Sequence, residues 1–277
     1  MSISAADVKK LRDMTGAGMM DCKKALAEAD GDFDKAVDLL RKKGQKVSEK
    51  RADREANQGL ILSKVTEDGS RAAAIEINCE TDFVARNEDF QNDAQSFLDA
   101  AFDNKIDNID DLLKLEIDGL TIEKHLEEMV GKIGEKIEIS KVIYAESEGS
   151  LISYIHPGNQ LGVIVEFEGD LPSEDIGKDV AMQVAAMKPI AVNREGVDSS
   201  LIEKELEIAK EQLLNEGKPE HIAEKAAQGK LRRFYEERVL LEQKFVKENS
   251  VSVQDYLKQN DAPTVKAFHR LQLGEEA

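Results

Sequence analysis

Apolar residues recur at helical spacing in three stretches near the start of the chain. We expect helices over Ala5–Met14, Met20–Glu28 and Phe33–Lys42, and the last stretch carries apolar residues at the i, i+3, i+4 and i+7 positions of one helix face. The Thr15–Gly18 turn ends the first helix and Gly44 ends the third, because glycine adopts the left-handed conformation of a helix C-cap. These signals predict a three-helix unit, which at about 40 residues is marginal alone and needs a docking surface.

Residues 45–57 interrupt this pattern with a run of charged and polar side chains. Such a run is typical of a linker or of a solvated helix, and it needs no functional explanation. We therefore predict a first domain at residues 1–45 and a linker at residues 46–57.

The middle of the chain contains strand-like segments that repeat at a constant offset of 90 residues. The segments Gly59–Val65 and Ala74–Ile77 align with Gly149–Ile155 and Ile164–Phe167. A turn signal lies between the two segments of each copy, so both copies are predicted to form β-hairpins. The turn signals are Asp68-Gly69 in the first copy and Gly158-Asn159 in the second.

Each hairpin leads into a helical segment, Glu88–Phe102 in the first copy and Ser173–Met187 in the second. A third strand is expected in the first copy at Ile137–Ala145, after a helix over Glu123–Gly131. A strand at Val265–Leu273 would complete the second sheet. The pattern predicts an α+β fold with a duplicated core, in which each copy is a small antiparallel sheet with helices on one face.

Two further helices, Ser199–Asn215 and Glu220–Lys244, are separated by a stop and restart signal at Glu216–Pro219. Such arms pack antiparallel as a protruding hairpin, like a short coiled coil. A docking or dimerisation role and a purely structural role both fit this hairpin. One more amphipathic helix is expected at Ser252–Gln259. The predicted core subdomains are residues 58–147 and residues 148–197 plus 244–277, and the hairpin is residues 198–243.

The two copies differ where each hairpin passes into its helix. The second copy uses the short Glu168–Pro172, whereas the first uses the longer Asn78–Arg86, which contains Asp82 and Phe83. The fold does not require the longer connection, and surface connections often carry function. A large apolar ring at this place either meets a partner surface or folds back beneath its own helix, with Asp82 as the helix cap.

The net charge of the chain indicates which class of partner it binds. The chain has 277 residues, enough for two or more domains, and a formal net charge of −18. This charge argues against direct binding of nucleic acid, which relies on lysine and arginine, and it is compatible with a protein partner that carries basic patches. The sequence has no signal-peptide pattern and no apolar run of membrane-spanning length, so we expect no membrane contact and a cytoplasmic location.

Residues typical of metal and redox sites are sparse. The two cysteines, Cys22 and Cys79, lie far apart, and the four histidines are scattered without a CxxC or HExxH spacing. We expect no metal site and no cofactor. Both thiols are interpreted as small core residues in a reducing compartment.

Two long segments resemble sequence signatures of the bacterial elongation factor Ts family. The first is Leu11–Leu26 and the second is Asn78–Arg86. The order of parts also agrees over essentially the whole chain, with a small helical domain, a duplicated core, a helical hairpin and a C-terminal segment. Mild departures are Glu80 and Arg86, where glutamine and lysine are common in the family.

Members of this family are guanine-nucleotide exchange factors. The resemblance implies that the chain binds elongation factor Tu, the GTPase that delivers aminoacyl-tRNA to the ribosome, and speeds release of its GDP without acting as an enzyme. It also implies that the N-terminal domain resembles a ubiquitin-associated (UBA) domain and docks on the G domain of the partner. The core would contact the partner near its magnesium site. A homodimer or a 2:2 complex through the helical hairpin is a further expectation.

The resemblance places Asp82 and Phe83 as a pair that intrudes near the magnesium site, flanked by Thr81 and Val84. We expect Phe83 to act as a wedge between helices of the partner. Asp82 would fix the loop or compete for groups around the metal.

Five further residues are candidate contacts. Helical periodicity predicts that one of Met19 and Met20 lies in the core and one is free, whereas the resemblance implies that both dock on the partner. His156 and Gly158 form a hairpin tip, which is either an ordinary tight turn or, by resemblance, a contact near the phosphate-binding loop of the partner. Ile133, between two glycines, is either a contact or the entry to a strand.

Two other classes of function compete with nucleotide exchange. A UBA-like interaction module without exchange activity would leave the duplicated core unexplained. An enzyme with a catalytic Asp82 or His156 lacks a recognisable nucleophile–base pair, a glycine-rich phosphate-binding loop and a metal-ligand spacing in the sequence. Copurification with intact elongation factor Tu would favour the exchange factor, and turnover of a small substrate would favour the enzyme.

Overall fold

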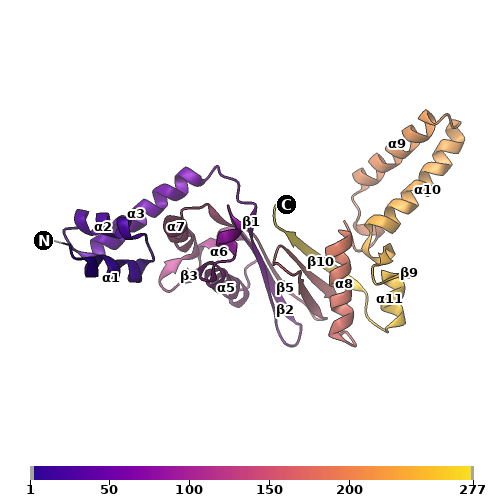
Figure 1. The fold of residues 1–277 in the computed structure, drawn as a ribbon. Helices are drawn as coiled ribbons and strands as arrows, with labels where there is room; N and C mark the ends of the chain where they lie inside the picture. Colours follow the sequence, from indigo (N-terminus) through magenta and orange to yellow (C-terminus); the bar gives the residue numbers. More distant parts are fainter. Residues whose placement is uncertain (1–2, 276–277) are drawn as a thin grey trace.

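The computed structural model describes residues 3–275, and its parts follow one another along an elongated molecule (Figure 1). Three N-terminal helices occupy one end, two small antiparallel sheets with their helices form the middle, and a pair of long helices projects from the other end. The predicted α+β fold class is confirmed. None of the helices described is both long and apolar enough to cross a membrane.

The N-terminal helices form where their local signals predict them. They are α1 (Ala5–Thr15), α2 (Met19–Glu28) and α3 (Phe33–Arg51). Ser4 caps α1 by accepting the N–H of Asp7, and Gly16 ends this helix in the left-handed conformation, with φ 66°. Cys22 is buried in the small core between the three helices, as predicted.

The third helix does not end at Gly44, as the sequence predicted. It continues to Arg51, so the first half of the charged segment 45–57 is helical. Gly44 is buried where α3 crosses α7 (Ile122–Ile133), and a Cβ added at Gly131 would lie 2.6 Å from the Cα of Gly44. Glycine therefore permits the close approach of two helix backbones here. This packing outweighs its helix-propensity cost of about 1 kcal/mol.

The first sheet has the strand order β1–β2–β5, and neighbouring strands are antiparallel. Its strands are β1 (Gln58–Val65), β2 (Arg71–Cys79) and β5 (Ile137–Glu146). The predicted hairpin and third strand are confirmed. Helices α5 (Glu88–Asp103) and α7 cover one face, over a core that includes Phe90 and Phe97. Three short elements that the sequence did not predict precede α7, namely α6 (Ile109–Lys114), β3 (Glu116–Ile117) and β4 (Leu120–Thr121).

The second sheet repeats this arrangement, with the strand order β10–β7–β6. Its strands are β6 (Leu151–Ile155), β7 (Leu161–Phe167) and β10 (Val265–Gln272). The predicted completion of this sheet by the C-terminal strand is confirmed. Helices α8 (Glu174–Met187) and α11 (Val253–Gln259) share its hydrophobic core.

The two sheets pack against each other through an apolar cluster that includes Ile61 and Leu151. Within residues 3–275, two backbone hydrogen bonds join the copies. The Ile61 N–H donates to the carbonyl of Asn159 (2.7 Å), and the Leu151 N–H donates to the carbonyl of Gly69 (2.8 Å). Leu151 and Asn159 lie 90 residues after Ile61 and Gly69, so the two bonds are equivalent under the sequence repeat. Each copy therefore holds the turn of the other.

The projecting hairpin consists of α9 (Ser199–Asn215) and α10 (Glu220–Arg238). The prediction that its second arm continues to Lys244 is wrong. Val239 and Leu240 are fully buried, and the Leu240 N–H donates to the carbonyl of Ala191 (2.9 Å), so the chain leaves the helix to join the core at the base of the hairpin. The remaining elements nearby are the 3-10 turns η1 (Arg194–Gly196) and η2 (Leu240–Glu242) and the strands β8 (Lys244–Phe245) and β9 (Glu248–Ser252).

The crossing of α3 and α7 can be tested with Gly131→Ala. The added methyl group would press on the backbone of Gly44, and such overpacking costs about 1–3 kcal/mol. We expect a lower free energy of unfolding in urea, measured by circular dichroism. Gly229→Ala in α10 is the matched control, because a Cβ there meets nothing within 4 Å and gains helix propensity. Equal stability of the two variants would contradict the close crossing.

Candidate functional site

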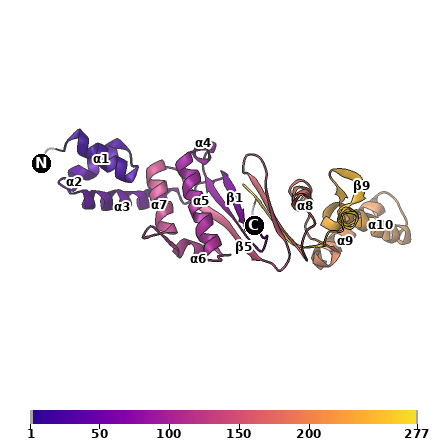
Figure 2. The ribbon, with the colours of Figure 1, turned by 90° about the horizontal axis from the view of Figure 1, so that it is seen from below.

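The first connection from sheet to helix contains a single-turn helix. Strand β2 ends at Cys79, α4 spans Asp82–Ala85, and Asn87 caps α5 by accepting the N–H of Phe90 (3.2 Å). Figure 2 shows α4 standing beside the end of α5, near β1. The longer connection of the first copy is therefore an ordered turn at the surface of the molecule.

Phe83 is exposed to 82%, more than the other large apolar side chains that the structure describes. The alternative in which its ring folds back beneath its own helix is therefore contradicted. Its neighbour Val84 packs on the core of the first sheet instead. Asp82 pairs with Arg86 at the surface (3.0 Å) and does not cap α5, because Asn87 holds that position.

Two carboxylates hold the chain immediately before α4. Glu135 accepts both the N–H (3.0 Å) and the hydroxyl (2.7 Å) of Thr81. Glu80 accepts the Lys136 N–H and the Arg51 guanidinium, each at 2.6 Å. The Lys136 N–H, together with Arg51, holds the pKa of the Glu80 carboxyl below its ordinary value. Sequence reasoning did not identify Glu135, Lys136 or Arg51 as part of this site, since no motif spacing connects them to it.

Cys79 lies beneath this turn and has no exposed surface. Its thiol donates to the carbonyl of Thr81 (3.1 Å). Burial, with a smaller effect from the negative charge of Glu135, raises the pKa of the Cys79 thiol to about 12. The thiol therefore stays neutral near pH 7 and is a poor nucleophile. Its prediction as a small core residue is confirmed.

The tip of the second hairpin lies beside α4. Asp82 and Arg86 line a surface hollow of about 530 Å³ together with Gly158. His156 is exposed at the same hairpin tip and shares a 2.8 Å hydrogen bond with the hydroxyl of Tyr154. The fold thus brings together two groups of predicted site residues that are far apart in the sequence.

Met19 and Met20 are both exposed, to 43% and 63%. The prediction that one of them lies in the core is wrong. Both belong to the first turn of α2, whose core-facing side is provided by Cys22, Ala25 and Leu26. They lie on α2, at the N-terminal end of the molecule (Figure 1).

Ile133 is the last residue of α7 and is half-buried against the core of the first sheet. The interpretation of this residue as a strand entry is wrong, because β5 begins only at Ile137. Gly134 follows in the left-handed conformation, with φ 81°, and ends the helix. The residues of this segment that touch the site follow Gly134. Glu135 binds Thr81, and the Lys136 N–H donates to Glu80.

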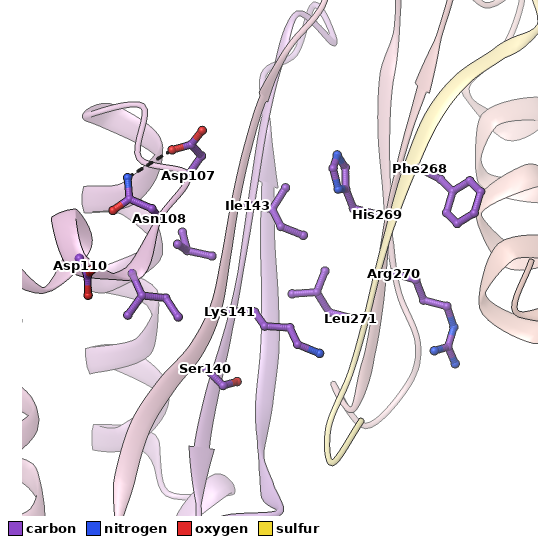
Figure 3. Close-up of a pocket in the computed structure, with 12 residues that line it drawn as sticks. Asp107, Asn108, Asp110, Ser140, Lys141, Ile143, Phe268, His269, Arg270 and Leu271 are labelled. Carbon is purple, nitrogen blue, oxygen red and sulfur yellow. Dashed lines mark hydrogen bonds between the residues drawn. The ribbon is translucent and has the colours of Figure 1, made fainter. Parts of the chain in front are cut away.

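A second hollow lies between the edge strands β5 and β10. Figure 3 shows Lys141 of β5 and His269 and Leu271 of β10 turned into the space between the two sheets. The Lys141 ammonium donates to the carbonyl of Glu275 (3.0 Å) and lies 3.7 Å from the carboxylate of Glu76, while burial lowers the pKa of His269. The Lys141 ammonium is thus engaged within the protein, and the hollow adds no support for the enzyme alternative.

Comparison with known proteins gives a consistent result. Residues 80–275 match the family model described as Elongation factor TS. The chain is 49% identical to an elongation factor Ts of Amoebophilus asiaticus over 278 residues, which cover 99% of this chain and 100% of the relative. It is also 49% identical to one of Christiangramia forsetii (98% and 99% covered) and 47% identical to one of Hydrogenobaculum sp. (99% and 100% covered). The resemblance to this family is thereby confirmed, and the chain belongs to the elongation factor Ts family of translation elongation factors.

Proposed function

We propose that this chain binds elongation factor Tu in its GDP-bound form and promotes release of the GDP by disturbing the site of Mg²⁺ and phosphate. It then remains bound until GTP loads. Family membership supports the role in translation elongation. The observation that carries the exchange mechanism is the 82% exposed ring of Phe83, on a helical turn that the core holds in place. The chain acts without covalent chemistry and without a cofactor of its own.

The energy for such exchange comes from differential binding. A nucleotide held at nanomolar affinity is bound by about 12 kcal/mol. Accelerating its release by about 10⁴-fold requires roughly 5.5 kcal/mol of preference for the nucleotide-free state of the partner over the loaded state. The coupling is reciprocal, so rebinding of a nucleotide weakens the hold of the exchange factor. No other energy source is needed.

Phe83 has the properties of the wedge that this mechanism needs. Burying an aromatic ring in a cleft of the partner contributes about 1.5–3 kcal/mol. A small displacement of partner helices is sufficient, because Mg²⁺ demands near-octahedral geometry. Among the residues that the structure describes, the Asp82 carboxylate forms an exposed ion pair with Arg86 alone, an interaction worth little in water. Its carboxylate is therefore free to change partner and compete for groups around the metal.

Other exposed residues extend the proposed contact surface. Gly158 lines the same hollow as Asp82 of α4, and His156 is exposed at the same hairpin tip, so this tip would meet the same region of the partner, on the side of its phosphate-binding loop. Met19 and Met20 present adaptable apolar side chains on the N-terminal helices, which would dock on the G domain. The net charge of −18 favours a protein partner with basic patches over direct contact with nucleic acid.

The wedge is tested by Phe83→Ala, measured as stopped-flow release of a fluorescent GDP analogue from elongation factor Tu. Loss of the ring removes about 1.5–3 kcal/mol of differential binding, so we expect the rate of release to fall by about ten- to hundredfold. Val246→Ala truncates another apolar side chain, which is 50% exposed and lies just before β9, far from α4 along the molecule (Figure 2), and this variant should retain the full rate. A correctly folded Phe83→Ala protein that exchanges at the wild-type rate would refute the wedge.

We also propose that the helical hairpin pairs two copies of the chain, as a homodimer or within a 2:2 complex. Ile208, Leu214 and Ile222 are apolar and each about 40% exposed or more on α9 and α10. Pairing with a second copy would bury these apolar side chains, which are exposed in a single chain.

Self-association is tested by sedimentation velocity. We expect wild-type protein to reach twice the 30.7 kDa chain mass as its concentration rises. Ile222→Lys should shift the equilibrium to the monomer, since it would place a charge in the apolar contact. Val246→Lys adds the same charge outside the hairpin and should behave as wild type. A wild-type chain that stays monomeric at all concentrations, alone and with its partner, would exclude pairing.

A further inference from the structure

We propose that Glu135 is a positioning residue for nucleotide exchange, which orders α4 so that Phe83 is presented to the partner in one fixed pose. This inference rests on the proposed function. Glu135 lies two residues after Ile133, the last residue of α7. Its carboxylate accepts two hydrogen bonds from Thr81, the residue immediately before α4, and not from Phe83 itself.

The first argument is that α4 does not stabilise itself. It has four residues, and none of them is fully buried. An isolated helix of this length is unstable in water, because nucleation fixes several dihedral angles for very few hydrogen bonds. Thr81 occupies the N-cap position, yet its side chain makes no capping bond to α4. The usual local source of helix-start stability is therefore missing.

The hydroxyl of Thr81 binds Glu135 instead. The same carboxylate accepts the hydroxyl at 2.7 Å and the Thr81 N–H at 3.0 Å, so both polar hydrogens of Thr81 are fixed by one side chain. Hydrogen bonds to an ionised carboxylate are roughly twice as strong as neutral ones. Because α4 begins at the next residue, fixing Thr81 fixes the direction in which the turn leaves the sheet.

The second argument is that the two segments hold each other. Glu135 binds the backbone of the 79–81 segment, while Glu80 binds the backbone N–H of Lys136 at 2.6 Å. Arg51, at the end of α3, adds a further bond to Glu80. In these reciprocal hydrogen bonds, a carboxylate of each segment binds the backbone of the other, and the two segments lie more than fifty residues apart in the sequence. The position of α4 is therefore set by the end of α7.

Gly134 places Glu135 at this point. Its left-handed conformation, with φ 81°, ends α7, and its N–H donates to the carbonyl of Val130. A Cβ at Gly134 would meet nothing within 4 Å, so the conformation and not the lack of space requires glycine.

The order of α4 affects the rate of exchange through the population of molecules that can act. If α4 were mobile, only a fraction of the bound molecules would present Phe83 correctly at any moment, and the effect of the wedge would fall to that fraction of its full value.

The test compares Glu135→Ala with Glu135→Gln and with the control Glu138→Ala. Alanine removes both acceptor oxygens of Glu135. We therefore expect the maximal rate of GDP release to fall by about five- to tenfold, because a smaller fraction of the molecules presents Phe83 correctly. The factor concentration at half-maximal rate should change less than about twofold, because the other contact surfaces are intact. Glutamine can accept the Thr81 N–H and donate to its hydroxyl, and should restore most of the rate. Among the described residues, the Glu138 carboxylate pairs only with the side chain of Lys136. Glu138→Ala should therefore leave the rate of GDP release unchanged.

Two further measurements separate positioning from general stability. Amide hydrogen exchange of residues 82–86 should become at least fivefold faster in the free Glu135→Ala protein, with the core strands unchanged. In a Phe83→Ala background the Glu135→Ala change should cause no further loss of rate, since it acts through the placement of that ring. An equal loss in both backgrounds, or unchanged amide exchange, would overturn the positioning role.

The outcomes distinguish this inference from the function on which it rests. If the wild-type protein does not accelerate GDP release, the proposed function is wrong, and amide exchange still decides whether Glu135 orders α4. If the wild-type protein is active and Glu135→Ala is equally active, the proposed function stands and the positioning role is refuted.

Discussion

The structure depends on the reciprocal packing of its two sheets. The Ile61 N–H binds the carbonyl of Asn159, the Leu151 N–H binds the carbonyl of Gly69, and apolar side chains fill the space between the sheets. Backbone groups buried at such a contact must be paired, so the relative position of the two copies is set by hydrogen bonds as well as by shape. This contact also creates the candidate site. It fixes the turn of the second hairpin against β1, and β1 pairs with β2, which ends just before α4.

The sequence predicted those parts of the fold that local patterns determine. Strand pairs, their turns and the 90-residue offset follow from alternation and glycine positions, and the structure contains them. The errors occur where a distant contact overrides a local signal. Gly44 is a plausible helix stop until Gly131 is known to cross it at van der Waals distance. Val239 and Leu240 continue an apolar helical pattern, yet they are buried at the hairpin base because the 189–192 segment pairs with them there.

The candidate site also combines features that the local sequence predicts with features that depend on distant contacts. Phe83 could be predicted as special from sequence, because the second copy lacks an equivalent connection. Its supporting residues could not, since Glu135 lies 54 residues from Thr81 and Arg51 lies 29 residues from Glu80. The chain has 56 acidic residues. Choosing the two whose carboxylates hold a backbone segment requires knowledge of which loops meet, and that knowledge comes only from the folded chain.

The duplication also provides an internal comparison for the exposed ring. In the second copy, the connection from strand to helix places Leu171 against its own core. In the first copy, Val84 already provides that apolar anchor on the core of the first sheet. Phe83 is thus additional to what the connection needs for folding, and at 82% exposure it gains almost none of the burial energy available to a core phenylalanine. A fold that holds such a side chain outward on an ordered turn gives up that burial energy, and a partner surface that receives the ring would recover it.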